Sequence, residues 1–380
     1  MSNFRTKKLL FNNYFTKMKT KYFSILLSSI LLISFSCSTG QGDSNSKPVT
    51  KNIIFMIGDG MGLSHVHAAM TANGGSLSLE GISHVGLHKT FSATSYITDS
   101  GASGTAMACG KKTYNGAIGV DVDHNELESI LKVAERNGLA TGLVATSTIT
   151  HATPAAFIAN DTLRKNYQAI AADFLLTDID VFIGGGLDDF TKREDKRDLT
   201  KELEEKGYTI ARNLDEVKAF TKGKLAGFTA DGANPGALDG RGDMLPEATK
   251  KALEILSQDE DGFFIMIEGS QIDWASHAND QEKTIAETLD FDKAVQVALD
   301  FAKEDGETLV VITADHETGG MVVLEGDYEK ATTKVAFSTH GHTGMMVPVY
   351  SYGPGAELFT GIFDNTEYKE KFISVCDLKE

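Results

Sequence analysis

The stretch that decides the fold is residues 52–62, "NIIFMIGDGMG", in which five consecutive apolar residues lead into an aspartate between two glycines. A continuous apolar run of this length is typical of a strand that is buried on both faces of a mostly parallel sheet. Similar runs, bounded by Gly, Asp or Thr, occur at residues 141–146, 181–186, 262–268, 308–313 and 346–352.

Between these runs, apolar residues recur three and four positions apart, which indicates helices at 124–137, 166–176, 245–257 and 279–304. The alternation predicts an α/β fold with a doubly wound, mostly parallel central sheet flanked by helices. We expect a single catalytic domain at 52–380. Residues 188–240 are richer in charge and Gly, and we interpret them as a peripheral excursion from this domain.

The N-terminal segment predicts export. The apolar run "YFSILLSSILLISFSC", residues 22–37, follows a basic stretch and is shorter than the roughly 20 apolar residues of a spanning helix. Residues 32–37, "LISFSC", resemble the lipobox of bacterial lipoproteins, and an ordinary cleaved secretory signal is the alternative. We expect a signal peptide at 1–36, a flexible linker at 37–51, and a periplasmic protein or one anchored to the outer membrane through a lipid on Cys37.

The charge balance excludes nucleic acid as a binding partner. The 380 residues include 36 Lys and Arg against 53 Asp and Glu, and six of those bases fall in the first 36 residues. Without this segment the formal charge is −23, which repels nucleic-acid backbones. A phosphate-bearing substrate would need a local positive centre. The two cysteines beyond Cys37, Cys109 and Cys376, are expected to be buried free thiols.

Four segments place hard metal ligands just past an apolar run. Carboxylate oxygen together with imidazole nitrogen suits Zn²⁺, whereas an all-oxygen set suits Mg²⁺. A single Asp after a strand is more often a helix cap, but four strand ends that all supply such ligands favour a polynuclear site. The candidate ligands are Asp59, Glu268, Asp273, His277, Asp315, His316 and His342.

Two further motifs suit an anion. In "TSYITDSGASGTAMACG", residues 94–110, Ser100 follows an expected short strand and begins a helix, where its hydroxyl would face a bound anion. The alternative is that Ser100 only caps the helix. In "HATPAAFIANDTLR", residues 151–164, Arg164 could grip two phosphoryl oxygens, or lie on a solvated surface.

Together the motifs "GDGMG", "TDSGAS", "HATPAA" with Arg164, "EGSQID-x-x-x-H", "TADHETGG" and "HTG" resemble the alkaline phosphatase family, in order from Asp59 to His342. The resemblance implies an alkaline phosphatase-like sandwich, a homodimer, and hydrolysis of phosphate monoesters at alkaline pH through a phosphoserine intermediate. It implies that Ser100 is the nucleophile and that Asp99 orients Arg164, which holds the phosphate. The implied ligands are Asp273, His277 and His342 for one zinc, Asp59, Asp315 and His316 for a second zinc, and Asp59, Thr153 and Glu268 for Mg²⁺.

His151 and Trp274 stand where some members of the family have Asp and Lys, and we place both beside the substrate. The missing lysine removes a charge near the phosphate, so we expect weaker retention of product and a more alkaline optimum. His151 also opens the third site to Zn²⁺ in place of Mg²⁺. Six other histidines show no pattern that predicts a role: His65, His67, His84, His88, His124 and His340.

Two alternative functions stay open. The first is a phosphodiesterase or sulfatase from the same superfamily, although "TDSGAS" does not resemble the C-x-P-x-R setting of a sulfatase nucleophile. The second, from another class, is a lipoprotein that binds zinc or phosphate without turnover.

Overall fold

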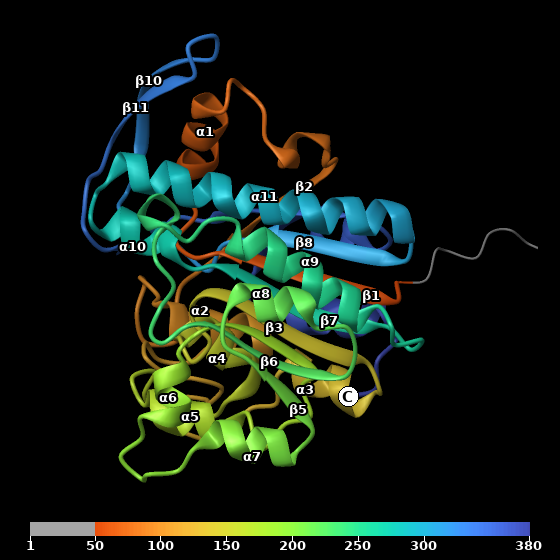
Figure 1. Cartoon of the computed structure of the whole chain (residues 1–380). Coiled ribbons are helices and arrows are strands. Elements are labelled where there is room, and N and C mark those ends of the chain that lie inside the picture. Colours follow the sequence, from red (N-terminus) through yellow and green to blue (C-terminus); the bar gives the residue numbers. More distant parts are fainter. Residues whose placement is uncertain (1–49) are drawn as a thin grey trace, which may run out of the picture. The chain divides into compact units, whose positions relative to one another are not determined.

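The computed structural model describes residues 50–380, and the predicted signal peptide and Cys37 lie outside the described residues. A ten-stranded sheet forms its centre (Figure 1). The strands of this sheet are β1 (Asn52–Gly58), β2 (His84–Lys89), β3 (Ala140–Thr148), β4 (Val181–Gly185), β5 (Tyr208–Ala211), β6 (Lys224–Ala230), β7 (Phe263–Gly269), β8 (Thr308–Thr313), β13 (Val347–Tyr352) and β14 (Gly361–Asp364).

The strands lie in the order β14-β2-β13-β8-β1-β7-β3-β4-β6-β5. β1 lies between β8 and β7 and pairs in parallel with both. β13 runs antiparallel to its neighbours β8 and β2. The mostly parallel sheet predicted from the sequence is therefore confirmed.

Helices pack on both faces of the sheet (Figure 1). The α-helices are α1 (Leu63–Ala72), α2 (Ser100–Cys109), α3 (Ile130–Arg136), α4 (Ala152–Ile158), α5 (Tyr167–Asp173), α6 (Leu187–Thr191), α7 (Leu199–Glu205), α8 (Leu214–Ala219), α9 (Met244–Leu256), α10 (Gln271–His277), α11 (Gln281–Asp305) and α12 (Glu367–Val375). Short 3₁₀ turns are η1 (Ser78–Gly81), η2 (Ala237–Asp239) and η3 (Ala356–Phe359).

The central position of β1 in the sheet explains why its sequence is continuously apolar. Ile53, Phe55 and Ile57 pack into one core cluster with residues of α2, α3, α4 and α12. Ile54 and Met56 point to the other face and join the cluster that includes α1, α9 and α11. Since successive side chains of a strand alternate between faces, covering both faces with helices requires apolar residues at every position.

All six apolar runs of the sequence form strands of the main sheet. Two expectations about local structure are wrong. The helix expected at 124–137 begins only at Ile130, because the Ser129 side chain caps it by accepting from the Lys132 N–H. No strand directly precedes Ser100, since residues 90–99 are irregular.

Residues 188–240 contribute β5 and β6 to one end of the sheet, together with α7 and α8. Two small antiparallel pairs lie outside the main sheet. These are β9 (Glu317–Thr318) with β12 (His342–Thr343), and β10 (Val322–Asp327) with β11 (Thr332–Ala336). The first pair matters for the site because it places His342 opposite Thr318. Within residues 50–380, no helix has the length and apolar character needed to cross a membrane.

Candidate active site

The candidate site lies at the carboxyl ends of neighbouring parallel strands. β8, β1, β7 and β3 are adjacent in the sheet and run in the same direction. Asp59 directly follows β1, and Asp315 lies two residues beyond β8. The Gly60 N–H donates to Asp315 Oδ1 at 3.1 Å, across 255 positions of the chain. Parallel strands that end at one edge of a sheet therefore bring distant motifs together.

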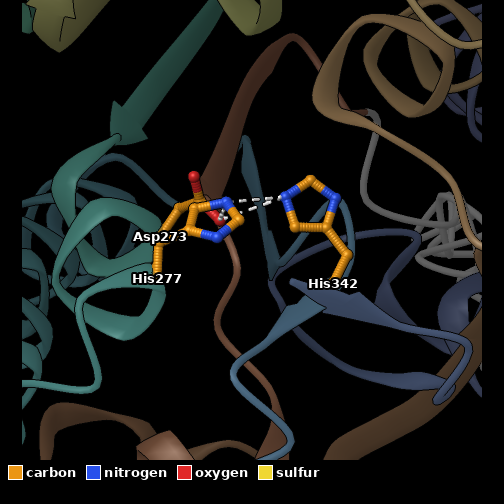
Figure 2. Close-up of side chains that lie close together, drawn as sticks. All are labelled: Asp273, His277 and His342. Carbon is orange, nitrogen blue, oxygen red and sulfur yellow. Dashed lines mark hydrogen bonds and ion pairs between the residues drawn. The ribbon is translucent and has the colours of Figure 1, made fainter. Parts of the chain in front are cut away.

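The first group of candidate ligands contains Asp273, His277 and His342 (Figure 2). Asp273 and His277 lie one turn apart in α10, and His342 reaches the group from β12. The Nε2 atom of His277 lies 3.1 Å from Nε2 of His342 and 3.3 Å from Asp273 Oδ1. His342 Nε2 lies 3.4 Å from the same carboxylate oxygen. Two imidazole nitrogens and a carboxylate oxygen that converge in this way suit Zn²⁺.

Backbone carbonyls orient both rings of this group. His277 Nδ1 donates to the His340 carbonyl at 2.5 Å, and His342 Nδ1 donates to the Thr98 carbonyl at 2.9 Å. A carbonyl can only accept, so each Nδ1 carries a proton, and Nε2 is the ring nitrogen left to bind a metal beside Asp273. His340, for which the sequence predicted no role, takes part through its backbone carbonyl.

The second group contains Asp59, Asp315 and His316, all fully buried. His316 Nε2 lies 3.1 Å from Asp315 Oδ2 and 3.5 Å from Asp59 Oδ1. The Ser100 hydroxyl lies 3.4 Å from the same nitrogen. The group therefore joins three predicted ligands to the predicted nucleophile.

Thr318 links the first two groups, and sequence reasoning missed it. Its hydroxyl donates to Asp273 Oδ1 at 2.5 Å and lies 3.3 Å from His316 Nδ1. The rings of His316 and His342 stack with centroids 3.6 Å apart. The position of Thr318 inside the motif "TADHETGG" was the one sequence signal that could have drawn attention to it.

The third group contains Asp59, Glu268 and His151. His151 is the N-cap residue of α4, so Thr153 and Pro154 lie in the first turn of that helix. Burial, reinforced by the nearby charge of Arg164, lowers the pKa of His151 to about 4, so its ring is neutral and able to donate a lone pair. The structure thus places His151 beside the expected Mg²⁺ ligands Asp59 and Glu268, and also beside Arg164.

The second and third groups fit divalent cations because buried oxygens in both lack other partners. Burial, and then the charges of Asp315, Asp273 and Glu268, raise the pKa of Asp59 well above its ordinary value. Burial also raises the pKa of Glu268 to about 7. Carboxylates packed this closely need positive charge to remain ionised. The buried oxygens without a hydrogen-bond partner are both Oδ atoms of Asp59, Oε1 of Glu268, Oδ2 of Asp315 and Oγ1 of Thr153.

Ser100 is the first residue of α2, and the structure does not support the alternative that it caps this helix. Asp99 is the N-cap residue, and its Oδ1 accepts from the N–H groups of Ala102, at 2.9 Å, and Gly116, at 3.1 Å. The Ser100 hydroxyl is therefore left for chemistry at the N-terminus of a ten-residue helix, where partial positive charge favours an anion.

Arg164 lies beside these residues rather than on a solvated surface. Its Nη1 donates to Asp99 Oδ2 at 2.9 Å, and both side chains are about 20% exposed. Its Nη2 lies 3.5 Å from His151 Nε2, and the His151 ring meets the Trp274 ring edge to face, with centroids 5.7 Å apart. An ion pair thus joins Asp99 to one side of the guanidinium, and Trp274 lies next to the site.

Among the described residues, the remaining predictions have mixed outcomes. Cys109 and Cys376 are free; Cys109 is buried as expected, whereas Cys376 is partly exposed. His65 and His88 are fully buried, although the sequence predicted no role for either.

Comparison with known proteins agrees with the family resemblance of the sequence motifs. The family profile for alkaline phosphatase matches residues 50–329. Alkaline phosphatase 3 of Bacillus subtilis is 37% identical over 83% of this chain and 87% of its own, and the Escherichia coli alkaline phosphatase is 33% identical over 86% of each. The structure of alkaline phosphatase from the Antarctic bacterium TAB5 superposes with a TM-score of 0.82 at 41% identity, covering 88% of this chain and 100% of that chain. With this match over most of its length, the chain belongs to the alkaline phosphatase family.

Proposed function

We propose that this member of the family hydrolyses phosphate monoesters at alkaline pH through a phosphoserine intermediate on Ser100. The observation that carries the proposal is the convergence of three metal-ligand groups beside the Ser100 hydroxyl, with Arg164 on the adjoining side. A binding protein needs no nucleophile, so this arrangement favours turnover.

The three groups would hold three divalent cations. Asp273, His277 and His342 suit one zinc, and Asp59, Asp315 and His316 suit a second. Asp59, Glu268 and Thr153, with His151 close by, suit Mg²⁺ or a further Zn²⁺. A variant of the TAB5 enzyme with a histidine replaced by aspartate has Mg bound in its M3 site. When bound, such ions lower the pKa of a hydroxyl and stabilise negative charge on reacting oxygens.

The side chains of this chain supply the remaining chemistry. Arg164 would bind two phosphoryl oxygens, while Asp99 keeps its guanidinium from turning away. Ser100 Oγ loses its proton to solvent and attacks phosphorus, so that a bond from Oγ to phosphorus forms and the bond to the alcohol oxygen breaks. The departing oxygen takes up a proton from solvent and leaves as the alcohol. Water then attacks the phosphoserine, which releases inorganic phosphate and restores the hydroxyl. Two displacements from opposite sides give retention at phosphorus.

The test combines metal analysis with hydrolysis of p-nitrophenyl phosphate before and after chelation and readdition of Zn²⁺ and Mg²⁺. We expect activity to disappear on chelation and to return with the metals. Ser100→Ala should lose most turnover while keeping its zinc, and full activity in this variant would remove Ser100 from its role. Faster hydrolysis of the bis ester than of the monoester would instead favour a diesterase.

We also propose that the protein is exported and forms a homodimer. The predicted signal peptide and lipobox support export and a lipid on Cys37, and family membership supports the dimer. Mass spectrometry of the mature N-terminus distinguishes a lipidated cysteine from a simple cleavage. Sedimentation of the purified protein measures its oligomeric state.

A further inference from the structure

His65 is a buried histidine that no step of the proposed reaction uses. It lies in the first turn of α1, which begins four residues after Asp59, and its side chain is 1% exposed. Burial lowers its pKa to about 4, so the ring is neutral near and above neutral pH. Both ring nitrogens have partners, and one of these partners lies far away in the sequence.

The partners determine which nitrogen carries the proton. The Gly62 N–H donates to His65 Nδ1 at 3.2 Å, so Nδ1 is the acceptor and Nε2 carries the hydrogen. Nε2 lies 3.0 Å from the Ser276 hydroxyl, 211 positions along the chain. Ser276 donates its own hydrogen to the Ile272 carbonyl at 2.7 Å. The chain of bonds from Gly62 through His65 and Ser276 to Ile272 therefore has one consistent direction.

This chain of bonds joins the two segments that carry ligands of different metal groups. Gly62 ends the turn that begins at Asp59, whereas Ser276 lies in α10 between Asp273 and His277. The turn also packs directly on α10, because a Cβ added at Gly60 would come within 3.0 Å of the Asp273 Cα. Gly60 has a φ of +74°, which only glycine adopts readily. A shift of α1 relative to α10 would therefore change the spacing of the two groups.

We propose that His65 is a positioning residue that sets the spacing between the Asp59 group and the Asp273–His277 group through its bond to Ser276. This inference rests on the proposed function, because it assigns a purpose to the spacing of two metal sites. A residue that holds ligand-bearing segments in this way supports metal affinity without touching the metal.

A simpler interpretation is that His65 only caps α1. The bond from the Gly62 N–H to Nδ1 is a capping interaction within one turn. The bond from Nε2 to Ser276 has no part in capping, so the two roles can be separated by mutation. His65→Asn keeps an acceptor for the Gly62 N–H but is too short to reach Ser276. Ser276→Ala removes the other end of the link and leaves the cap intact.

The experiment measures zinc affinity by competition with a chromophoric chelator for the wild type, both single variants and the double variant. We expect each single variant to bind zinc about 10-fold more weakly, which is the lower end for residues that support metal ligands. The double variant should be no weaker than either single variant, because both changes break the same link. The visible absorption spectrum of the Co²⁺-substituted protein should change in both single variants, since it reports ligand geometry.

Two controls separate positioning from general loosening of α1. His67→Asn changes the same residue type on the exposed side of the helix and should leave zinc affinity unchanged. Val66→Ala removes a buried side chain of α1, which should lower the unfolding midpoint of the metal-free protein without weakening zinc.

The proposal is overturned if Ser276→Ala binds zinc as tightly as the wild type, or if the two single effects add in the double variant. It is also overturned if Val66→Ala weakens zinc as much as His65→Asn does. Ser276→Ala alone decides the matter if His65→Asn does not fold. A wild-type protein that binds no zinc, or binds it without hydrolysing p-nitrophenyl phosphate, would instead contradict the proposed function.

Discussion

Removing the divalent cations should make this protein lose stability as the pH rises above neutral. The cause is the group of carboxylates that includes Asp59 and Glu268, both fully buried. Burial and neighbouring acids raise the pKa of Asp59, and burial raises the pKa of Glu268 from 4.5 to about 7. Without metals, ionisation of these groups opposes folding. Bound cations would remove this penalty.

Glu268 gives the scale of the effect. Each unit of pKa shift corresponds to about 1.4 kcal/mol, so the rise from 4.5 to about 7 costs roughly 3 kcal/mol once the group is ionised in both states. The folded-state pKa is raised, so the penalty grows from pH 4.5 upward and is complete above about pH 7. Between pH 6.5 and 8.5, Glu268 alone contributes a further loss of about 1 kcal/mol. Asp59 changes stability in the same direction.

Buried histidines act in the opposite direction but at lower pH. Burial lowers the pKa values of His65, His88 and His151 to about 4. Because these side chains stay neutral in the folded protein, they lower the free energy of unfolding only below about pH 6.5, where the unfolded chain takes up protons. Restricting the measurement to pH 6.5–8.5 excludes the titration of these three histidines. In this window His342 acts in the same direction as the carboxylates: burial opposes its charging, but Asp273 raises its pKa above the ordinary value, so the stability that it adds is lost as the pH rises.

The assay is urea unfolding of metal-free and metal-loaded protein at several pH values, followed by the fluorescence of Trp274, the single tryptophan of the chain. Metal-free Glu268→Gln should be at least about 1 kcal/mol more stable than metal-free wild type at pH 8.5, because it removes one buried charge. Glu325→Gln, which changes an exposed acid in β10, should have little effect. A metal-free protein whose stability is constant or rises between pH 6.5 and 8.5 would refute the reasoning.

Three further predictions concern the phosphate side of the site. Arg164→Lys should raise the inhibition constant for inorganic phosphate about tenfold, because a point charge replaces a two-pronged donor; an unchanged constant would contradict phosphate binding by Arg164. Asp99→Asn keeps an oxygen for the Ala102 N–H but ends the ion pair, so KM should rise while the urea midpoint stays nearly unchanged. Trp274→Lys should lower the inhibition constant for phosphate, since it adds a positive charge beside His151; weaker inhibition would place residue 274 away from the anion.

Much of the fold could be predicted because central strands have a strong local pattern. β1 and β8 are buried on both faces, so their apolar runs are continuous and easy to recognise. Two strands near one end of the sheet were missed for the same physical reason. β2 and β14 include exposed positions, and their sequences therefore lack a continuous run. The helix that begins at Ile130 was predicted to begin at residue 124, because a serine cap, rather than apolar spacing, decides where it begins.

In the candidate site, the sequence showed which side chains could bind a metal but not how they are oriented. The motifs contain the donor atoms of Asp273, His277 and His342. The carbonyls of His340 and Thr98, which select the nitrogen that each ring presents, were not predictable, because any residue can supply a carbonyl. The same holds for the link between His65 and Ser276, which joins segments 211 positions apart.

The sequence by itself determined the α/β class, the buried strands and the identity of the candidate ligands, because burial and chemical type are properties of local segments. The tertiary structure alone decided that β8, β1, β7 and β3 lie side by side and that Asp99, rather than Ser100, caps α2. Strand order depends on how distant segments pack, and a hydroxyl is left for catalysis only when a neighbouring side chain satisfies the helix end. These are contacts between parts of the chain that no local pattern records.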